Sequence, residues 1–224
     1  QAARPFAPQL AAAAVLLPDR ALRARPETLA RAAALLDGSG GAALGEDDGA
    51  DIALALEAGV PVPAPRLQRF LQPLHGFKKI VIADGLLLRQ LRLWLPRSRI
   101  ASLGEALSGI ASVRGALRAT DLYVIEPRAY HADYQRLVRY YDALRAAAGC
   151  SFNLDLQRIA IPATARSLAQ GLGSEGASVQ ARWILQGRNV TRIVLESLED
   201  GAAFSQVTGL PLVHLADLAD DGKS

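Results

Sequence analysis

The sequence predicts an α/β fold built from two similar parallel-sheet lobes that are related by an internal repeat. Short apolar runs alternate with amphipathic stretches along the chain, which is typical of parallel strands connected by helices. The clearest run, residues 79–83, is apolar almost throughout, as expected of a strand covered on both faces. The same order of elements then recurs about 109 to 113 residues later, and this recurrence predicts the second lobe.

The first half is expected to contain three strands and four helices. A helix over residues 26–36 opens with Pro26 and Glu27, which suit a first helical turn, and the glycine-rich residues 37–41 end it. A proline-rich linker over residues 60–65 separates two further helices. The expected strands and helices are residues 11–17, 26–36, 47–58, 66–74, 79–83, 86–95 and 100–101.

The second half is expected to begin with a strand that ends before Pro127. A long helix follows, and Gly149 is placed as its C-cap. Residues 153–161 alternate apolar and polar side chains, which predicts a strand closed by Pro162. The expected elements are residues 121–125, 132–148, 153–161, 179–185, 192–195, 199–207 and 212–215.

The repeat divides the chain into a first lobe, residues 1–110, and a second lobe, residues 111–224. Residues 79–84 align with residues 192–197, and in both copies a helix and a short strand follow. The competing interpretation is that any two strand–helix units resemble each other at this level.

Composition excludes several classes of protein. Hydrophobic residues make up 50% of the 224 residues and charged residues 21%, which is ordinary for a globular protein. The net charge is +3 and the arginines are scattered, so no nucleic-acid partner is expected. No apolar run approaches the roughly 20 residues that span a bilayer. The sequence begins at Gln1 and contains no methionine, so targeting signals are not judged from it.

The few reactive residues favour structural roles. The single cysteine, Cys150, forms no internal disulfide and is expected to be a small buried side chain. His131 is the candidate base for a catalytic thiol in this half, and the three separated histidines form no metal triad. Residues 38–43 fit a G-x-G-x-x-A phosphate loop, but the segment before them is helical. A helix stop is therefore the favoured interpretation.

The order of elements, used twice, resembles the tandem Cys-Cys-Gly domains of heterodisulfide-reductase-type iron–sulfur oxidoreductases. The amino-acid sequence of residues 121–131 and 153–162 looks most similar to the C-terminal region of the iron–sulfur proteins of dimethylglycine demethylation. In that family cysteines follow the first strand, the helix and the later strand of each repeat. Here only Cys150 stands at such a position, so the resemblance implies that the cluster cysteines have been lost.

The resemblance implies a non-catalytic or degenerate, cluster-less domain of an electron-transfer oxidoreductase that acts as a scaffold or docking surface. Its redox partner would be an electron-transfer flavoprotein or an iron–sulfur subunit. No cofactor and no metal are expected in this chain, because the iron–sulfur cluster of the parent family would lie elsewhere. The implied location is cytoplasmic, with membrane association only through other parts or subunits.

The alternative is a small-molecule-binding or enzyme domain with a polar cleft between the lobes, since ligands of open α/β sheets bind at the carboxyl ends of strands. Such a pocket would use Arg128, His131, Asp155 and Arg158. A collapsed cleft, whose polar groups pair with one another, is the competing expectation. The candidate cofactor-binding or relic cleft residues are Arg20, Ser39, Asp84, Arg128, His131, Cys150, Asp155 and Glu196.

Overall fold

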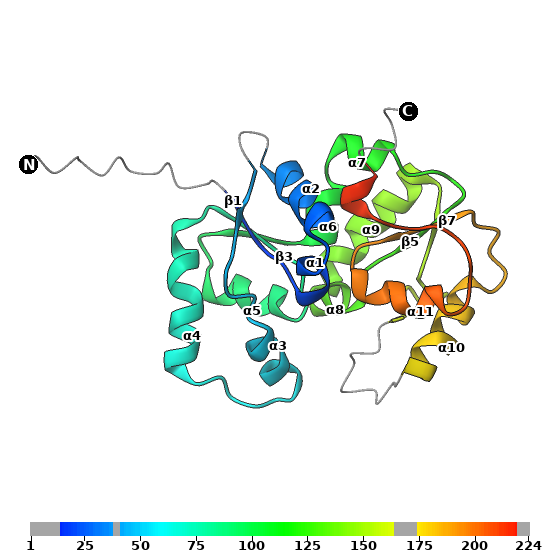
Figure 1. Cartoon of the computed structure of the whole chain (residues 1–224). Coiled ribbons are helices and arrows are strands. Elements are labelled where there is room, and N and C mark those ends of the chain that lie inside the picture. Colours follow the sequence, from blue (N-terminus) through cyan, green and yellow to red (C-terminus); the bar gives the residue numbers. More distant parts are fainter. Residues whose placement is uncertain (1–13, 38–40, 164–173, 219–224) are drawn as a thin grey trace, which may run out of the picture.

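A computed structural model describes residues 14–37, 41–163 and 174–218, and it confirms the α/β fold with two four-stranded parallel sheets. Sheet A has the order β2-β1-β3-β4 and sheet B the order β6-β5-β7-β8, so the repeat is preserved strand by strand. The two sheets lie side by side (Figure 1). The strands are β1 (Ala14–Leu17), β2 (Ala43–Leu44), β3 (Lys79–Ile82), β4 (Arg99–Ser102), β5 (Asp121–Val124), β6 (Ser151–Phe152), β7 (Arg192–Leu195) and β8 (Leu212–His214).

Helices connect the strands and cover the sheets. Pro26 begins α2, as predicted, and Gly149 ends α9 in the left-handed conformation, with φ of 68°. The helices of the first half are α1 (Arg20–Arg23), α2 (Pro26–Leu36), α3 (Ala50–Glu57), α4 (Ala64–Leu71), η1 (Gln72–Gly76), α5 (Leu87–Trp94), α6 (Leu103–Ser108) and α7 (Ala111–Gly115). Those of the second half are α8 (Pro127–Ala132), α9 (Tyr134–Ala148), α10 (Ser174–Leu185), η3 (Leu198–Asp200), α11 (Gly201–Ser205) and η4 (Leu215–Asp217).

The central strands are buried on both faces, which explains their apolar sequences. In β5, Leu122 and Val124 face one hydrophobic cluster while Tyr123 faces the other, because side chains alternate along a strand. The larger cluster draws residues from both lobes. The smaller cluster lies under α10 and α11 within the second lobe.

The structure corrects several expected boundaries. The alternating residues 153–161 form no strand: β6 ends at Phe152, and a loop with one bridge between Leu154 and Ala160 follows. The helix expected over residues 132–148 is α9, which begins at Tyr134, and a separate short helix that was not expected, α8, precedes it and ends at Ala132. The two-residue strands β2 and β6 were missed because so short a run carries no periodicity.

The lobes are packed against each other. Helix α5 of the first half contacts α8 of the second, and α2 contacts η4. Arg31 on α2 donates to Asp217 on η4 at 2.6 Å. Because the larger core cluster is continuous across the halves, the division at residues 110 and 111 stays a prediction.

Two glycines mark where the lobes meet. A Cβ atom built on Gly104, in α6, would collide with the carboxyl group of Glu196 after β7. A Cβ atom on Gly85, after β3, would collide with Glu126 and Ala129 of the second half. The ends of the strands therefore approach each other too closely for any side chain at these two positions.

We predict that Gly104→Ala costs about 3 kcal/mol of unfolding free energy, because the added methyl overpacks a buried carboxyl group. The matched control is Gly115→Ala in α7, where nothing lies within 4 Å of the added Cβ. That variant should be unchanged or up to about 1 kcal/mol more stable, since alanine favours a helix. Urea denaturation of both variants measures the difference, and equal effects would contradict the close contact.

Candidate functional site

The ends of the strands meet at a polar cluster centred on Arg128, in the first turn of α8. Its Nε donates to Glu126 Oε1 at 2.6 Å, and its terminal nitrogens lie 3.5 Å from Asp84 Oδ1 and 3.4 Å from Glu199 Oε2. Asp84 follows β3, so this ion cluster joins the two lobes. We call the following residues the seam: Asp84, Glu126, Arg128, Glu196, Glu199 and Asp200.

Asp200 gives the seam an unsatisfied carboxyl group. Its side chain is buried, and Oδ1 has no hydrogen-bond partner among the described residues. Burial raises the pKa of Asp200 well above its usual range, and the nearby charge of Glu126 raises it further. Burial likewise raises the pKa of Glu126. Since one guanidinium faces several buried carboxyl groups, the seam disfavours a negative charge on all of them at once.

Glu196 is the best-connected group of the seam. Its Oε1 accepts the hydroxyls of Tyr123 at 2.6 Å and Tyr141 at 2.7 Å, and its Oε2 accepts the backbone N–H of Glu126 at 2.8 Å. These donors lower the pKa, but full burial outweighs them and raises the pKa of Glu196 to about 7. Glu196 is thus a buried group that exchanges a proton near neutral pH.

His214 caps η4 beside the seam. Its Nδ1 accepts the backbone N–H of Ala216 at 3.1 Å, so the neutral ring carries its proton on Nε2. That nitrogen donates to the carbonyl of Glu196 at 3.2 Å, and burial lowers the pKa of His214 to about 4. The ring is a neutral structural cap.

The structure brings together three of the predicted cleft residues, Asp84, Arg128 and Glu196, and separates the others. Arg20 is exposed at the start of α1. Cys150 is buried in the larger core cluster, and burial raises the pKa of its thiol to about 11. Ser39 lies outside the described residues.

His131 and Asp155 lie at the loop that follows β6 (residues 154–161, called the 154–161 loop). The ring of His131 contacts the carbonyl of Ala160 at 3.1 Å through Nε2. Asp155 Oδ1 accepts the backbone N–H groups of Gln157 and Ile159, each at 2.8 Å. The side chains of His131 and Asp155 are therefore bonded to backbone groups of the 154–161 loop. Neither side chain has a described hydrogen bond to a seam residue.

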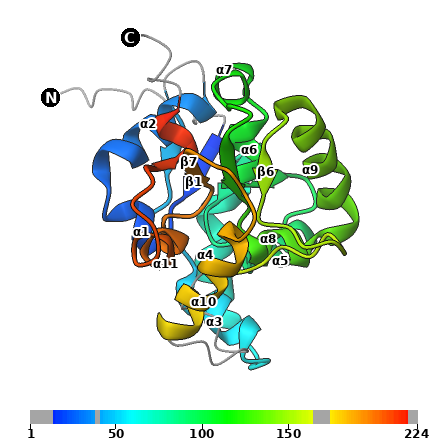
Figure 2. The same cartoon turned by 90° about the vertical axis from the view of Figure 1, so that its right-hand side faces the viewer.

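The 154–161 loop and α10 enclose a groove of about 840 Å³, which we call the Arg188 groove. Arg188 follows α10, and its guanidinium donates to the carbonyls of Ile184 and Leu154. Arg158 donates to Asp142 of α9 at 2.9 Å, and Arg145 lies 3.5 Å from the same carboxylate. Helix α10 is the element at the front of Figure 2. The lining includes Arg145, Asp155, Leu156, Arg158, Trp183 and Arg188.

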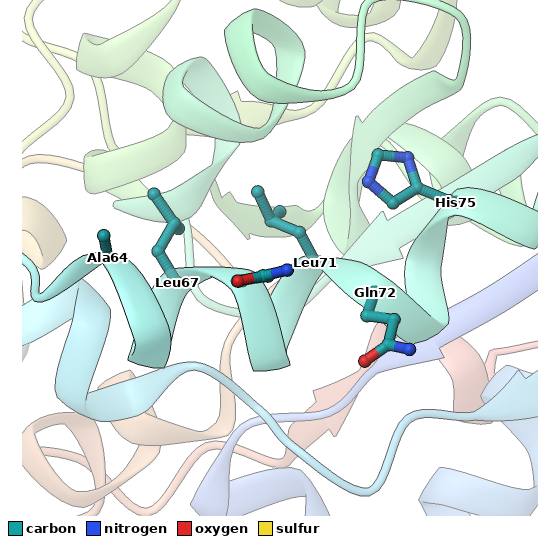
Figure 3. Close-up of a pocket in the computed structure, with 6 residues that line it drawn as sticks. Ala64, Leu67, Leu71, Gln72 and His75 are labelled. Atoms are coloured by element: carbon teal, nitrogen blue, oxygen red, sulfur yellow. The ribbon is translucent and has the colours of Figure 1, made fainter.

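A second hollow, of about 450 Å³, lies along α4 and η1 (Figure 3). Leu67 and Leu71 point to the same side of α4, and His75 lies beyond its end (Figure 3). The lining carries two leucines, two glutamines and one histidine but no charged acid or arginine. This hollow thus lacks the fixed charges that would select a ligand.

Sequence reasoning missed Glu126, Asp200, Trp183 and Arg188. Glu126 stands two residues before Arg128, directly after a strand, so the rule that found Arg128 could have found it. Arg188 gives no such signal, because it follows a helix and its groove partner Leu154 lies 34 residues away. Within the described ranges, no three His, Cys, Asp or Glu side chains are arranged to hold a metal ion, and no helix is long and apolar enough to cross a membrane.

Comparison with known proteins does not support the iron–sulfur resemblance. No family model and no curated protein matches the chain. A solved structure that does match is the aspartate racemase of Picrophilus torridus, with a TM-score of 0.45 and 9% identity over 93% of this chain and 90% of that one. The predicted membership of the heterodisulfide-reductase-type family is therefore wrong. The interpretation as a degenerate electron-transfer domain falls with it.

We predict that the free energy of unfolding falls as pH rises from about 4.5 to about 7. The folded protein retains a proton on Glu196 up to about pH 7, whereas an ordinary glutamate releases it near 4.5. The folded state therefore binds more protons in this window, and the stability present below pH 4.5 is lost as pH rises, by about 3 kcal/mol.

The variant Glu196→Gln should show a shallower fall over the same range, and the exposed Glu46→Gln serves as the control. Urea denaturation at half-unit pH steps provides the measurement. Parallel profiles for Glu196→Gln and the wild-type protein would show that Glu196 titrates normally.

Proposed function

We propose that the chain is a ligand-binding domain that holds an anionic group of its ligand in the Arg188 groove. The observation that carries this proposal is the half-buried guanidinium of Arg188. Its hydrogen-bond partners are two backbone carbonyls, and no described carboxylate pairs with it. Burial lowers the pKa of Arg188, which means that its surroundings disfavour the charge.

A half-buried charge without a carboxylate partner is costly, and an anion that enters the groove would relieve that cost. The carbonyl of Ile184, near the end of α10, offers Arg188 only the partial negative charge of a helix C-terminus, and the carbonyl of Leu154 is a neutral group of the 154–161 loop. A carboxylate or phosphate, which a guanidinium binds with two parallel hydrogen bonds, fits this requirement.

The rest of the groove suits a ligand with an anionic group and a flat apolar part. Arg145 and Arg158 add two cations that share the single carboxylate of Asp142. Trp183 is half-exposed on the wall and offers an aromatic face for stacking. A volume of about 840 Å³ lies within the range typical of small-molecule sites.

The proposal moves the predicted pocket away from the space between the lobes. Contacts at Gly85 and Gly104 fill the seam, and Arg128 is already neutralised there by three carboxylates. Of the four residues expected to line a pocket, Asp155 and Arg158 do line the Arg188 groove. The absence of a cofactor, the partners and the cytoplasmic location stay predictions.

We predict that phenyl phosphate, and more weakly inorganic phosphate, raise the melting temperature of the protein. Arg188→Gln should weaken phenyl phosphate binding at least tenfold, since a hydrogen bond to a charged group contributes about 1.5–3 kcal/mol. The matched control is Arg97→Gln, an exposed arginine outside the groove, which should bind like the wild-type protein.

Thermal-shift titration and the fluorescence of Trp183 measure these affinities, and a Trp94→Phe variant leaves Trp183 as the single tryptophan. Because removal of an uncompensated charge relieves strain, Arg188→Gln should be nearly as stable as the wild-type protein without ligand. The proposal fails if neither anion binds, or if Arg188→Gln binds phenyl phosphate as tightly as Arg97→Gln does.

A further inference from the structure

We infer that the natural occupant of the Arg188 groove is a peptide segment of a partner protein in which acidic and large apolar residues alternate. This inference rests on the proposed function and deepens it, because it names the kind of molecule that carries the anionic groups. The shape of the groove, the apolar side chains on its rim and its charge each support it.

The groove continues into a second hollow along α10. This hollow, of about 620 Å³, shares Trp183 and Gln186 with the Arg188 groove and extends to Val179 and Val207. Together the two form a path along one side of α10, an element of twelve residues. An extended chain matches a path of this kind, since a compact ligand would occupy only one of the two hollows.

Apolar side chains that a partner would cover line this path. The side chain of Leu156 is fully exposed, at 104% of its reference area, and Val179 and Trp183 are exposed at 52% and 50%. They are three of the nine large hydrophobic residues that are exposed in the described part of the chain. Exposed apolar side chains gathered in one region typically mark an interaction surface.

The 154–161 loop holds Leu156 and Arg158 in fixed positions. Arg158 adopts the left-handed conformation with φ of 65°, which is uncommon for a residue with a side chain. The hydroxyl of Tyr130 donates to the carbonyl of Arg158 at 2.9 Å, and the Asp155 carboxylate ties down the loop as described above. A surface ordered before binding loses little conformational entropy when a partner docks.

Positive charge dominates the path and selects an acidic partner. Three arginines and one aspartate line the Arg188 groove, and Arg182 lines the adjoining hollow. Arg188 lines one hollow and Arg182 the other, while Trp183 and Gln186 line both, so each hollow offers a cation to the same bound chain. Alternating acidic and apolar side chains would pair with both kinds of group.

The test compares three fluorescein-labelled ten-residue peptides by fluorescence anisotropy. One alternates Asp with Leu, one alternates Asp with Ser, and one alternates Lys with Leu. The Asp/Leu peptide should bind at least tenfold more tightly than either of the others, and 0.5 M NaCl should weaken it.

Leu156→Gln should weaken the Asp/Leu peptide about tenfold, because a leucine contact is lost, and should leave inorganic phosphate binding unchanged. Leu54→Gln, at a leucine on α3 that is 52% exposed, is the control outside the path and should change neither. If phosphate and phenyl phosphate bind but the Asp/Leu peptide binds no better than the Asp/Ser peptide, the inference is overturned and the proposed function stands. If no anion and no peptide binds, both fail.

Discussion

The contact between Glu196 and the opposite lobe is the constraint on which the rest of the structure depends. One buried carboxyl group receives two tyrosine hydroxyls and a backbone N–H, and Gly104 leaves it just enough room. Tyr123 lies on β5 and Tyr141 on α9, so this group fixes the central strand, its covering helix and the start of α8 at once. These hydrogen bonds all lie within the second lobe, and the first lobe meets the carboxyl group through the packing of Gly104 against it. Separating the lobes would therefore uncover a buried polar network.

Helix α8 connects the seam to the 154–161 loop and holds the loop in place. Its first turn is capped by Glu126 and holds Arg128 in the seam, while its last turn presents Tyr130 and His131 to the backbone of Arg158 and Ala160. A helix of six residues is short enough to act as a rigid block. The position of the 154–161 loop, and with it the shape of the groove, therefore depends on the contact between the lobes. The residues that line the groove nevertheless all lie in the second half.

The sequence predicted the architecture well and the site only in part, for a physical reason. Short, nearly continuous apolar runs such as residues 79–83 and 192–195 are typical of parallel strands that are buried on both faces. The order of the strands along the chain could therefore be predicted from the sequence. Asp84 and Glu196, which directly follow two of the strand runs, and Arg128, in the helix turn after a third, were found because ligands gather at the ends of strands. The 154–161 loop misled, since it alternates like a strand while Leu156 points to solvent, and Arg188 meets Leu154 only through tertiary packing. An alternation of apolar and polar residues indicates that successive side chains face opposite directions, and an extended loop can show this pattern as well as a strand.

The seam and the Arg188 groove carry opposite charge imbalances, and their surroundings resolve them differently. In the seam the excess is carboxylate, and a carboxylate in a packed, dry interior can be neutralised by a proton, as the raised pKa values of Glu126 and Asp200 indicate. In the groove the excess is guanidinium, which does not release its proton at physiological pH. Among the described residues no carboxylate pairs with Arg188, and the groove leaves space beside it. The seam is therefore a closed structural junction, and the groove is the region where we propose that a ligand binds.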